Sequence, residues 1–254
     1  MTELTPAVFL IVCPMLFLAG FVDAIGGGGG LISLPAFLFA GLPVHTAIAT
    51  NKLSVCFGTG LATFRFLKKG LVDMSLALPS VLAAMAGSFL GARLSLHVSE
   101  QVLKYVLFAV LPAAAFVVLN KHLFHDNDGL EGVSRQRTLT VSLISAFVIG
   151  IYDGFYGPGT GTFLIIAFNV FARMSIAGAN AQSKIINLTT NLTSLTVFFL
   201  NGQVLLPLGI AAALCNMAGN YLGTGLVMTK GPKIVRPIIL TVLCLLLIKI
   251  LTDL

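Results

Sequence analysis

The sequence predicts an all-α polytopic membrane protein with two homologous repeats and with broken or re-entrant helices after glycine-rich motifs. Three observations carry this prediction: the composition, the grouping of apolar residues into long segments, and the recurrence of these segments. Of the 254 residues, 57% are hydrophobic and 9% are charged, and the mean hydropathy is +1.01. Soluble domains carry about 25% charged residues, so this chain has too few charges to cover a surface in water.

The composition also excludes several functions. The net charge is +6, but the basic residues lie between apolar runs and are not clustered with aromatic residues, so no nucleic-acid partner is expected. The four cysteines lie in apolar segments without paired spacing, and we interpret them as small buried hydrophobes. They are Cys13, Cys56, Cys215 and Cys244. No metal, cofactor or enzyme chemistry is expected.

The apolar segments define the predicted helices. A bilayer core about 30 Å thick needs about 20 apolar residues per helix. The first half of the chain has segments at about 7–25, 31–42, 45–67, 71–97 and 101–119. The second half has them at about 138–156, 162–172, 175–200, 203–229 and 234–251. The segments at 31–42 and 162–172 are too short to span alone, so we expect half-helices or re-entrant pieces beside a break.

Rare residues recur in the same order in both halves, which predicts a first repeat over 1–119 and a second over 138–254. At an offset of 132 the sequence pairs Lys52 with Lys184, Gly87 with Gly219 and Gly91 with Gly223. At an offset of 130 it pairs Gly20 with Gly150 and Asp23 with Asp153. Chance matches of apolar residues do not explain paired lysines, aspartates and Gly-x-x-x-Gly motifs. We interpret these motifs as close helix packing.

The polar stretch 120–137 is predicted to be a linker between the repeats. Its His122, His125, Asp126 and Asp128 resemble metal ligands, but we interpret them as a solvated loop because no fixed element presents them together.

The distribution of basic residues favours inverted repeats. If each copy crosses the membrane five times, ten basic residues fall on one side, as expected of a cytoplasmic face. They are Arg65, Lys68, Lys69, Lys121, Arg135, Arg137, Arg173, Lys230, Lys233 and Arg236. Arg93, Lys104 and Lys249 fall on the other side, with both termini. Parallel repeats would divide the basic residues almost evenly.

Glycine-rich breaks follow the first segment of each repeat. Five consecutive glycines at membrane depth, Gly26–Gly30, must line a cavity or be buried in protein. Helices then begin at Leu31 and Thr162, and their N-termini would attract an anion. Close packing of helices through small residues is the alternative interpretation. The predicted backbone donors are Gly27, Gly28, Gly29, Gly30, Gly157, Gly159, Thr160 and Gly161.

Two lysines lie within predicted spans at equivalent places in the two copies. A lysine at hydrocarbon depth is costly and faces a pathway or a partner. Lys52 and Lys184 therefore bind an anionic substrate, form ion pairs with Asp23 and Asp153, or do both. The aspartates are candidates for proton coupling or for holding the lysines. Neutral donors suited to a multi-oxygen anion are Thr50, Asn51, Gln182, Ser183 and Asn187.

At these residues the sequence resembles the TauE/SafE sulfite exporter family. The resemblance rests on Gly26–Gly30 followed by Leu-Ile-Ser-Leu-Pro35, Gly-Leu-Pro43 and Ala-Thr-Asn-Lys52, and on Tyr152-Asp-Gly-Phe-Tyr-Gly-Pro-Gly-Thr-Gly161. It covers nearly the whole chain. It implies a bacterial inner-membrane permease that moves small sulfur-containing anions such as sulfite, thiosulfate or organosulfonates.

Together these patterns predict a secondary transporter working by alternating access, with both termini periplasmic. The expected partners are a small anion and the lipid bilayer, and a homodimer stays an open alternative to a single copy. An anion channel and a non-transporting assembly partner are the other functions that the residues allow.

Overall fold

The computed structural model describes residues 4–103, 105–106 and 134–230, and every regular element in this part of the chain is helical. The elements are α1 (Pro6–Gly26), α2 (Gly30–Phe39), α3 (Val44–Lys68), α4 (Met74–His97), α6 (Arg135–Phe155), α7 (Thr160–Ile166), the π-helix η2 (Ala167–Phe171), α8 (Ile176–Leu200) and α9 (Leu206–Lys230). By length and composition, α1, α4 and α6 qualify as membrane spans. The all-helical, apolar prediction is therefore confirmed for the described residues.

Some predictions fall on residues outside this description. They include the segment 234–251, most of the segment 101–119, and Cys244. They also include residues 120–133 of the predicted linker, with His122, His125, Asp126 and Asp128.

Several predicted helix boundaries were wrong by one to three residues, and three of the helix starts have a local cause. Helix α2 begins at Gly30 because Gly29 already has right-handed helical dihedrals, at φ −53° and ψ −32°. Helix α7 begins at Thr160 because Gly159 takes a left-handed conformation, at φ 87°, and caps it. Helix α6 begins at Arg135, inside the predicted linker, because the Ser134 side chain accepts a hydrogen bond from the Arg137 N–H group.

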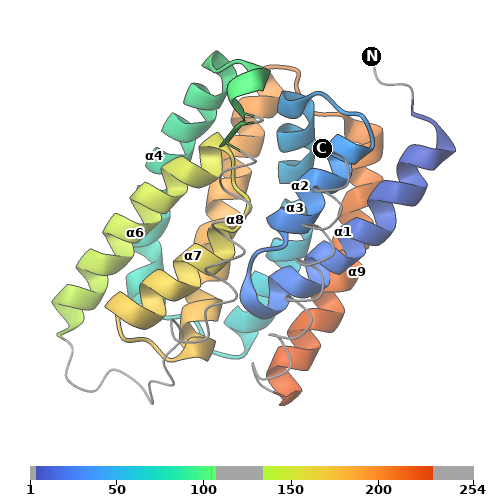
Figure 1. The fold of residues 1–254 in the computed structure, drawn as a ribbon. Helices are drawn as coiled ribbons and strands as arrows, with labels where there is room; N and C mark the ends of the chain where they lie inside the picture. The colour runs from blue at the N-terminus through green and yellow to red at the C-terminus, as the bar shows by residue number, and fades with distance from the viewer. Residues whose placement is uncertain (1–3, 104, 107–133, 231–254) are drawn as a thin grey trace.

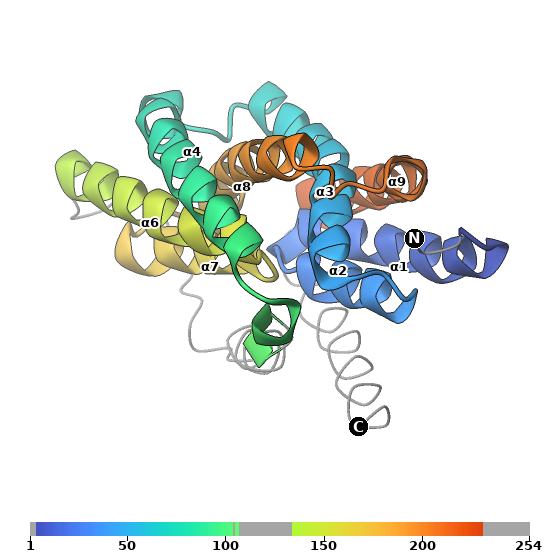
Figure 2. The same cartoon turned by 90° about the horizontal axis from the view of Figure 1, so that it is seen from above.

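The described helices form two bundles (Figure 2). Helix α4 of the first half of the chain packs in the bundle of the second half, and α9 of the second half packs in the bundle of the first, so we call α4 and α9 the exchanged helices. The first bundle comprises α1, α2, α3 and α9, and the second comprises α4, α6, α7, η2 and α8. The most extensive contacts are those of α4 with α6 and of α1 with α9. Helices α3 and α8 pack against each other where the bundles meet. Each bundle thus combines helices from both halves of the sequence.

Glycines allow the exchanged helices to pack closely. A Cβ on Gly87 or Gly91 of α4 would lie about 2 Å from a carbonyl oxygen of α6, those of Phe147 and Ile151. On α9, Gly219 and Gly223 meet the carbonyls of α1 at Phe17 and Phe21 in the same way. The predicted packing role of these Gly-x-x-x-Gly motifs is confirmed.

The direction of the helices places most described basic residues at one end of the molecule. In Figure 1, α3 and α9 run downward, α4, α6 and α8 run upward, and α2 turns back along α1. The C-terminal end of α3 and the start of α6 therefore share the lower end, where Arg135 donates a 2.6 Å hydrogen bond to the Ser75 hydroxyl. Exposed basic residues at this end are Lys68, Lys69, Arg135, Arg137 and Arg173.

Candidate functional site

The two glycine-rich breaks touch each other in the middle of the molecule. Gly27, which follows α1, has φ +72°, and a Cβ there would lie 2.3 Å from the Thr162 backbone nitrogen. The Thr162 hydroxyl donates a 3.1 Å hydrogen bond to the Gly26 carbonyl. Only a residue without a side chain permits this approach, so Gly27 brings the two breaks into backbone contact.

The first buried ion pair joins α8 to the end of α1. Lys184 Nζ lies 2.7 Å from Asp23 Oδ2 and also donates to the Asp23 backbone carbonyl. The side chains of Lys184 and Asp23 are 0% and 7% exposed. Lys184 thus has two acceptors on one residue, and its charge lies at the C-terminus of a helix, where a cation is favoured.

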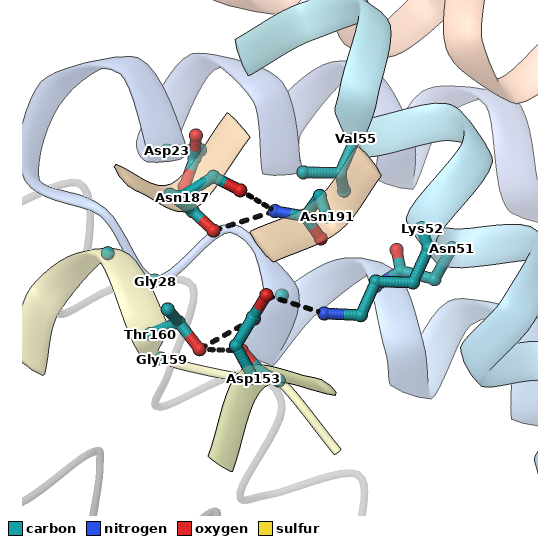
Figure 3. A pocket seen from close by; sticks show the side chains of 13 residues that line it. Asp23, Gly28, Asn51, Lys52, Val55, Asp153, Gly159, Thr160, Asn187 and Asn191 are labelled. Atoms are coloured by element: carbon teal, nitrogen blue, oxygen red, sulfur yellow. Dashed lines mark hydrogen bonds and ion pairs between the residues drawn. The ribbon is translucent and has the colours of Figure 1, made fainter. Parts of the chain in front are cut away.

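The second ion pair joins α3 to α6 and is the counterpart of the first at the sequence offsets given above. Lys52 Nζ lies 2.9 Å from Asp153 Oδ2, and each side chain is 2% exposed. The other carboxylate oxygen, Oδ1, accepts a 2.7 Å hydrogen bond from the Thr160 hydroxyl, as Figure 3 shows. The same hydroxyl lies 2.7 Å from the Gly157 carbonyl, so its single proton has two possible acceptors.

These charges balance within the site. Two lysines face two aspartates, and each pair links helices from different halves of the chain. Burying a charge without a partner costs several kcal/mol, which explains why each buried lysine forms an ion pair with a carboxylate. The predicted ion pairing of Lys52 and Lys184 with the aspartates is present in the structure.

A small polar cavity of about 20 Å³ lies between the breaks and the Lys52–Asp153 pair (Figure 3). It is lined by both aspartates, by one of the two lysines, by backbone of both breaks and by amide side chains. The lining residues are Asp23, Gly28, Gly30, Asn51, Lys52, Val55, Asp153, Gly157, Gly159, Thr160, Gly161, Asn187 and Asn191. The Asn51 Oδ1 atom is buried and has no hydrogen-bond partner among the described residues.

The remaining predicted site residues lie outside the cavity lining. Lys184 is held by Asp23, and the Thr50 hydroxyl accepts a 3.0 Å hydrogen bond from the Leu205 N–H group. The Ser183 hydroxyl donates to the Asn180 carbonyl, and Gln182 is buried with its Nε2 atom unpaired in the described structure. Gly27 and Gly29 serve close packing, because a Cβ on either would strike backbone or the Asp23 side chain.

Sequence reasoning missed two polar residues at the site. Asn191 Nδ2 donates a 2.6 Å hydrogen bond to Asn187 Oδ1 and lines the cavity. Its spacing of seven residues from Lys184 places both on one face of α8, which is the signal that could have identified it. Asn180 Nδ2 lies within hydrogen-bond distance of the Ala24 and Ile25 carbonyls, at 3.3 and 3.1 Å, in the last turn of α1. Such carbonyls lack partners within their own helix.

This combination of apolar helices, two broken helices and buried cross-linked charges defines a helical integral membrane protein. The sequence profile described as "Sulfite exporter TauE/SafE" matches residues 12–250. The chain therefore belongs to the TauE/SafE family of membrane transporters.

Named relatives agree with this assignment. The chain is 36% identical over 238 residues to "Probable membrane transporter protein ORF9" of Sinorhizobium sp, covering 93% of this chain and 90% of that protein. It is 35% identical over 240 residues to "Probable membrane transporter protein YfcA" of Escherichia coli K12, covering 93% and 87%. A "Probable membrane transporter protein" of Haemophilus influenzae is 33% identical over 237 residues, covering 93% and 92%. No solved structure matches the chain.

Proposed function

We propose that the protein is a secondary transporter of small anions, namely sulfite, thiosulfate or organosulfonates, in the bacterial inner membrane. The observation that carries the proposal is the cavity between the two breaks, which holds the Lys52 ammonium group, the start of α2 and several amide side chains. The N–H groups of Leu31, Ile32 and Ser33 already donate to the Gly28 and Gly29 carbonyls, so α2 attracts an anion through the positive end of its helix dipole. Sulfur oxyanions are proposed as substrates because the matching family is described as "Sulfite exporter TauE/SafE".

Alternating access by two inverted repeats is part of the proposal. It is supported by α3 and α8, which have 25 residues each and begin and end 132 positions apart. It is also supported by the opposite directions of these helices in Figure 1. The basic end of the molecule would face the cytoplasm, and the start of α1, at the other end, would face the periplasm. A site at the interface of inverted repeats is typical of secondary transporters.

The substrate can be tested without assuming a direction of transport. We expect sulfite, thiosulfate or an organosulfonate to raise the melting temperature of the purified protein in detergent, because a ligand stabilises the state it binds. In proteoliposomes, flux of the same anion should saturate and show counter-exchange. Flux without saturation would indicate a channel, and the absence of binding and flux across sulfur anions and carboxylates would indicate an assembly partner.

The lysines provide the test of the site. We expect the Lys52→Ala, Lys184→Ala double variant to lose flux while Lys68→Ala, which removes an exposed lysine, keeps it. The single Lys52→Ala and Lys184→Ala variants distinguish the contribution to flux of Lys52, which lines the cavity, from that of Lys184, which does not. Unchanged flux in the double variant would contradict the proposed site.

A further inference from the structure

We infer that the two ion pairs have different roles: the Lys52–Asp153 pair opens to take up one substrate anion together with one proton on Asp153, while the Lys184–Asp23 pair stays closed as an anchor. This inference rests on the proposed transport function and adds to it a coupling ion and the residue that carries it.

The buried charges of the site balance one another. The formal charges of the two lysines and two aspartates sum to zero, and every one of these side chains is at least nine-tenths buried. An entering anion would leave this buried site with an excess negative charge, which is costly in a low-dielectric environment. A proton on one carboxylate removes the excess and frees one lysine to bind the anion.

The transport step is balanced as follows. A proton from the medium binds the Asp153 carboxylate, Lys52 stays an ammonium ion, and the anion replaces the carboxylate as its partner. On the other side the anion leaves, Asp153 releases the proton, and the ion pair re-forms. One monovalent anion and one proton cross together, and the step carries no net charge.

The two aspartates differ in the contacts that hold their carboxylates. Asp153 Oδ2 is 2.9 Å from Lys52 Nζ but is not aligned for a hydrogen bond with any donor in the described residues. The Thr160 hydroxyl on the other oxygen can turn to the Gly157 carbonyl, also 2.7 Å away, when the carboxylate becomes protonated. Opening this pair therefore leaves Thr160 with an acceptor.

The Asp23 pair has the opposite character. Lys184 binds both the carboxylate and the backbone carbonyl of Asp23, and it does not line the cavity. An entering anion reaches Lys52 directly, whereas Lys184 is fully buried behind its partner. Separating Lys184 from Asp23 would cost two hydrogen bonds and would detach α8 from the end of α1.

The other groups around Asp153 do not replace it as proton acceptor. The charged or titratable groups facing it are Lys52 and Cys56 of α3, Tyr152 beside it on α6, and Asp23 across the cavity. A thiol and a phenol are neutral near pH 7, so they add no charge to the balance. From α7 and α8 the cavity receives Thr160, Asn187 and Asn191, which do not titrate.

The coupling can be measured in proteoliposomes with [¹⁴C]methanesulfonate, which stays a monovalent anion over the whole pH range used. Because thiosulfate is a dianion near neutral pH, [³⁵S]thiosulfate serves as a second probe of binding and exchange only. With the outside more acidic than the lumen, we expect the wild-type protein to accumulate methanesulfonate about tenfold per pH unit, because one pH unit corresponds to a factor of ten in proton concentration. A membrane potential set with potassium and valinomycin should not change this accumulation, because the step carries no net charge.

The matched variants are Asp153→Asn and Asp23→Asn. We expect Asp153→Asn to exchange labelled for unlabelled methanesulfonate at equal pH but to lose accumulation driven by the pH gradient. We expect Asp23→Asn to lower the melting temperature while its remaining flux still follows the pH gradient. In case Asp153→Asn does not fold, proton uptake by the wild-type protein is a second measurement. When methanesulfonate is added in weak buffer, the protein should take up about one proton per anion bound.

The outcomes separate this inference from the proposed function. If the wild-type protein binds and transports neither probe, the transport of sulfur anions itself is contradicted, and the coupling inference fails with it. If it exchanges a probe but ignores the pH gradient and takes up no proton on binding, only the coupling inference is overturned. The same holds if Asp153→Asn keeps full pH-driven accumulation.

Discussion

Lys184 binds Asp23 through both the side chain and the main chain of that residue, with 2.7 Å between Lys184 Nζ and Asp23 Oδ2. The contact fixes α8 of the second half of the chain to the last turn of α1 in the first half. A single lysine therefore connects two helices whose sequence positions lie 161 residues apart.

Removing this lysine should strongly destabilise the protein. We expect Lys184→Met to lower the free energy of unfolding by about 3–5 kcal/mol, because it leaves the buried Asp23 carboxylate without a partner. Chemical unfolding in detergent measures the change. Lys68→Met, which alters an exposed lysine at the end of α3, is the control and should be nearly neutral. Equal stability of the two variants would show that the buried pair contributes nothing.

Gly91 in α4 and Gly60 in α3 predict opposite effects for the same substitution by alanine. Gly91→Ala should destabilise the protein by about 1–3 kcal/mol, because the new methyl group would lie 2.0 Å from the Ile151 carbonyl oxygen. Gly60→Ala should be neutral or stabilise by up to about 1 kcal/mol, because the nearest atom is 3.8 Å away and alanine favours a helix. Melting temperatures of the two variants check this. A tolerated Gly91→Ala would contradict the close packing of α4 on α6.

Arg173 is a non-glycine residue with a left-handed backbone, at φ 57°. Such a conformation costs a residue with a Cβ roughly 1–2 kcal/mol, so Arg173→Gly should raise the melting temperature. Gly41 occupies the corresponding turn of the first half, at φ +85°, and Gly41→Ala should lower it. Thermal unfolding of the two variants tests the pair. The explanation by backbone strain is wrong if both substitutions shift stability in the same direction.

Asp73 caps α4 and predicts a dependence of stability on pH. A hydrogen bond from the Ser75 hydroxyl, with further bonds from backbone N–H groups, lowers the pKa of this carboxyl in the folded protein. A lowered pKa means that the stabilisation is fully present above the pKa of the unfolded chain. It is then lost as pH falls through the folded value.

Two variants isolate this contribution. Asp73→Ala should lower the free energy of unfolding by about 0.5–2 kcal/mol at neutral pH. On acidification, the free energy of unfolding of this variant should fall by less than that of the wild type. Asp73→Asn keeps a capping oxygen and should keep most of the neutral-pH stability. Unfolding curves from neutral to acidic pH measure both effects. An unchanged slope with pH in Asp73→Ala would contradict the capping role.

Much of the architecture could be predicted from the sequence, because a membrane makes polar residues and glycine clusters rare and therefore informative. The segment 45–67 became α3, Val44–Lys68, and the segment 175–200 became α8, Ile176–Leu200. The glycine runs identified both breaks, and the two intramembrane lysines pointed to the two aspartates. Three errors at helix starts arose where a glycine or serine sets the first turn, and α4 begins at Met74 because Asp73 caps it.

Which lysine pairs with which aspartate could not be predicted, because it depends on how distant helices pack. Lys52 and Lys184 are equivalent in the sequence pattern, yet in the structure only Lys52 lines the cavity. No local pattern indicates that Asp23 offers Lys184 its backbone carbonyl as well as its carboxylate. The role of Asn191 could not be predicted for a similar reason. An asparagine in an apolar helix indicates a polar contact, but the sequence does not identify the partner.

The exchange of α4 and α9 has a mechanical consequence. Each bundle combines separate stretches of the sequence, so the boundary between the bundles does not coincide with the boundary between the predicted repeats. Within the described residues, the chain passes from one bundle to the other at the α3–α4 and α8–α9 turns. Each turn contains a glycine in a left-handed conformation, Gly70 at φ +66° and Gly202 at φ +68°. In the proposed alternating access, these two short connections would act as a pair of hinges between the bundles.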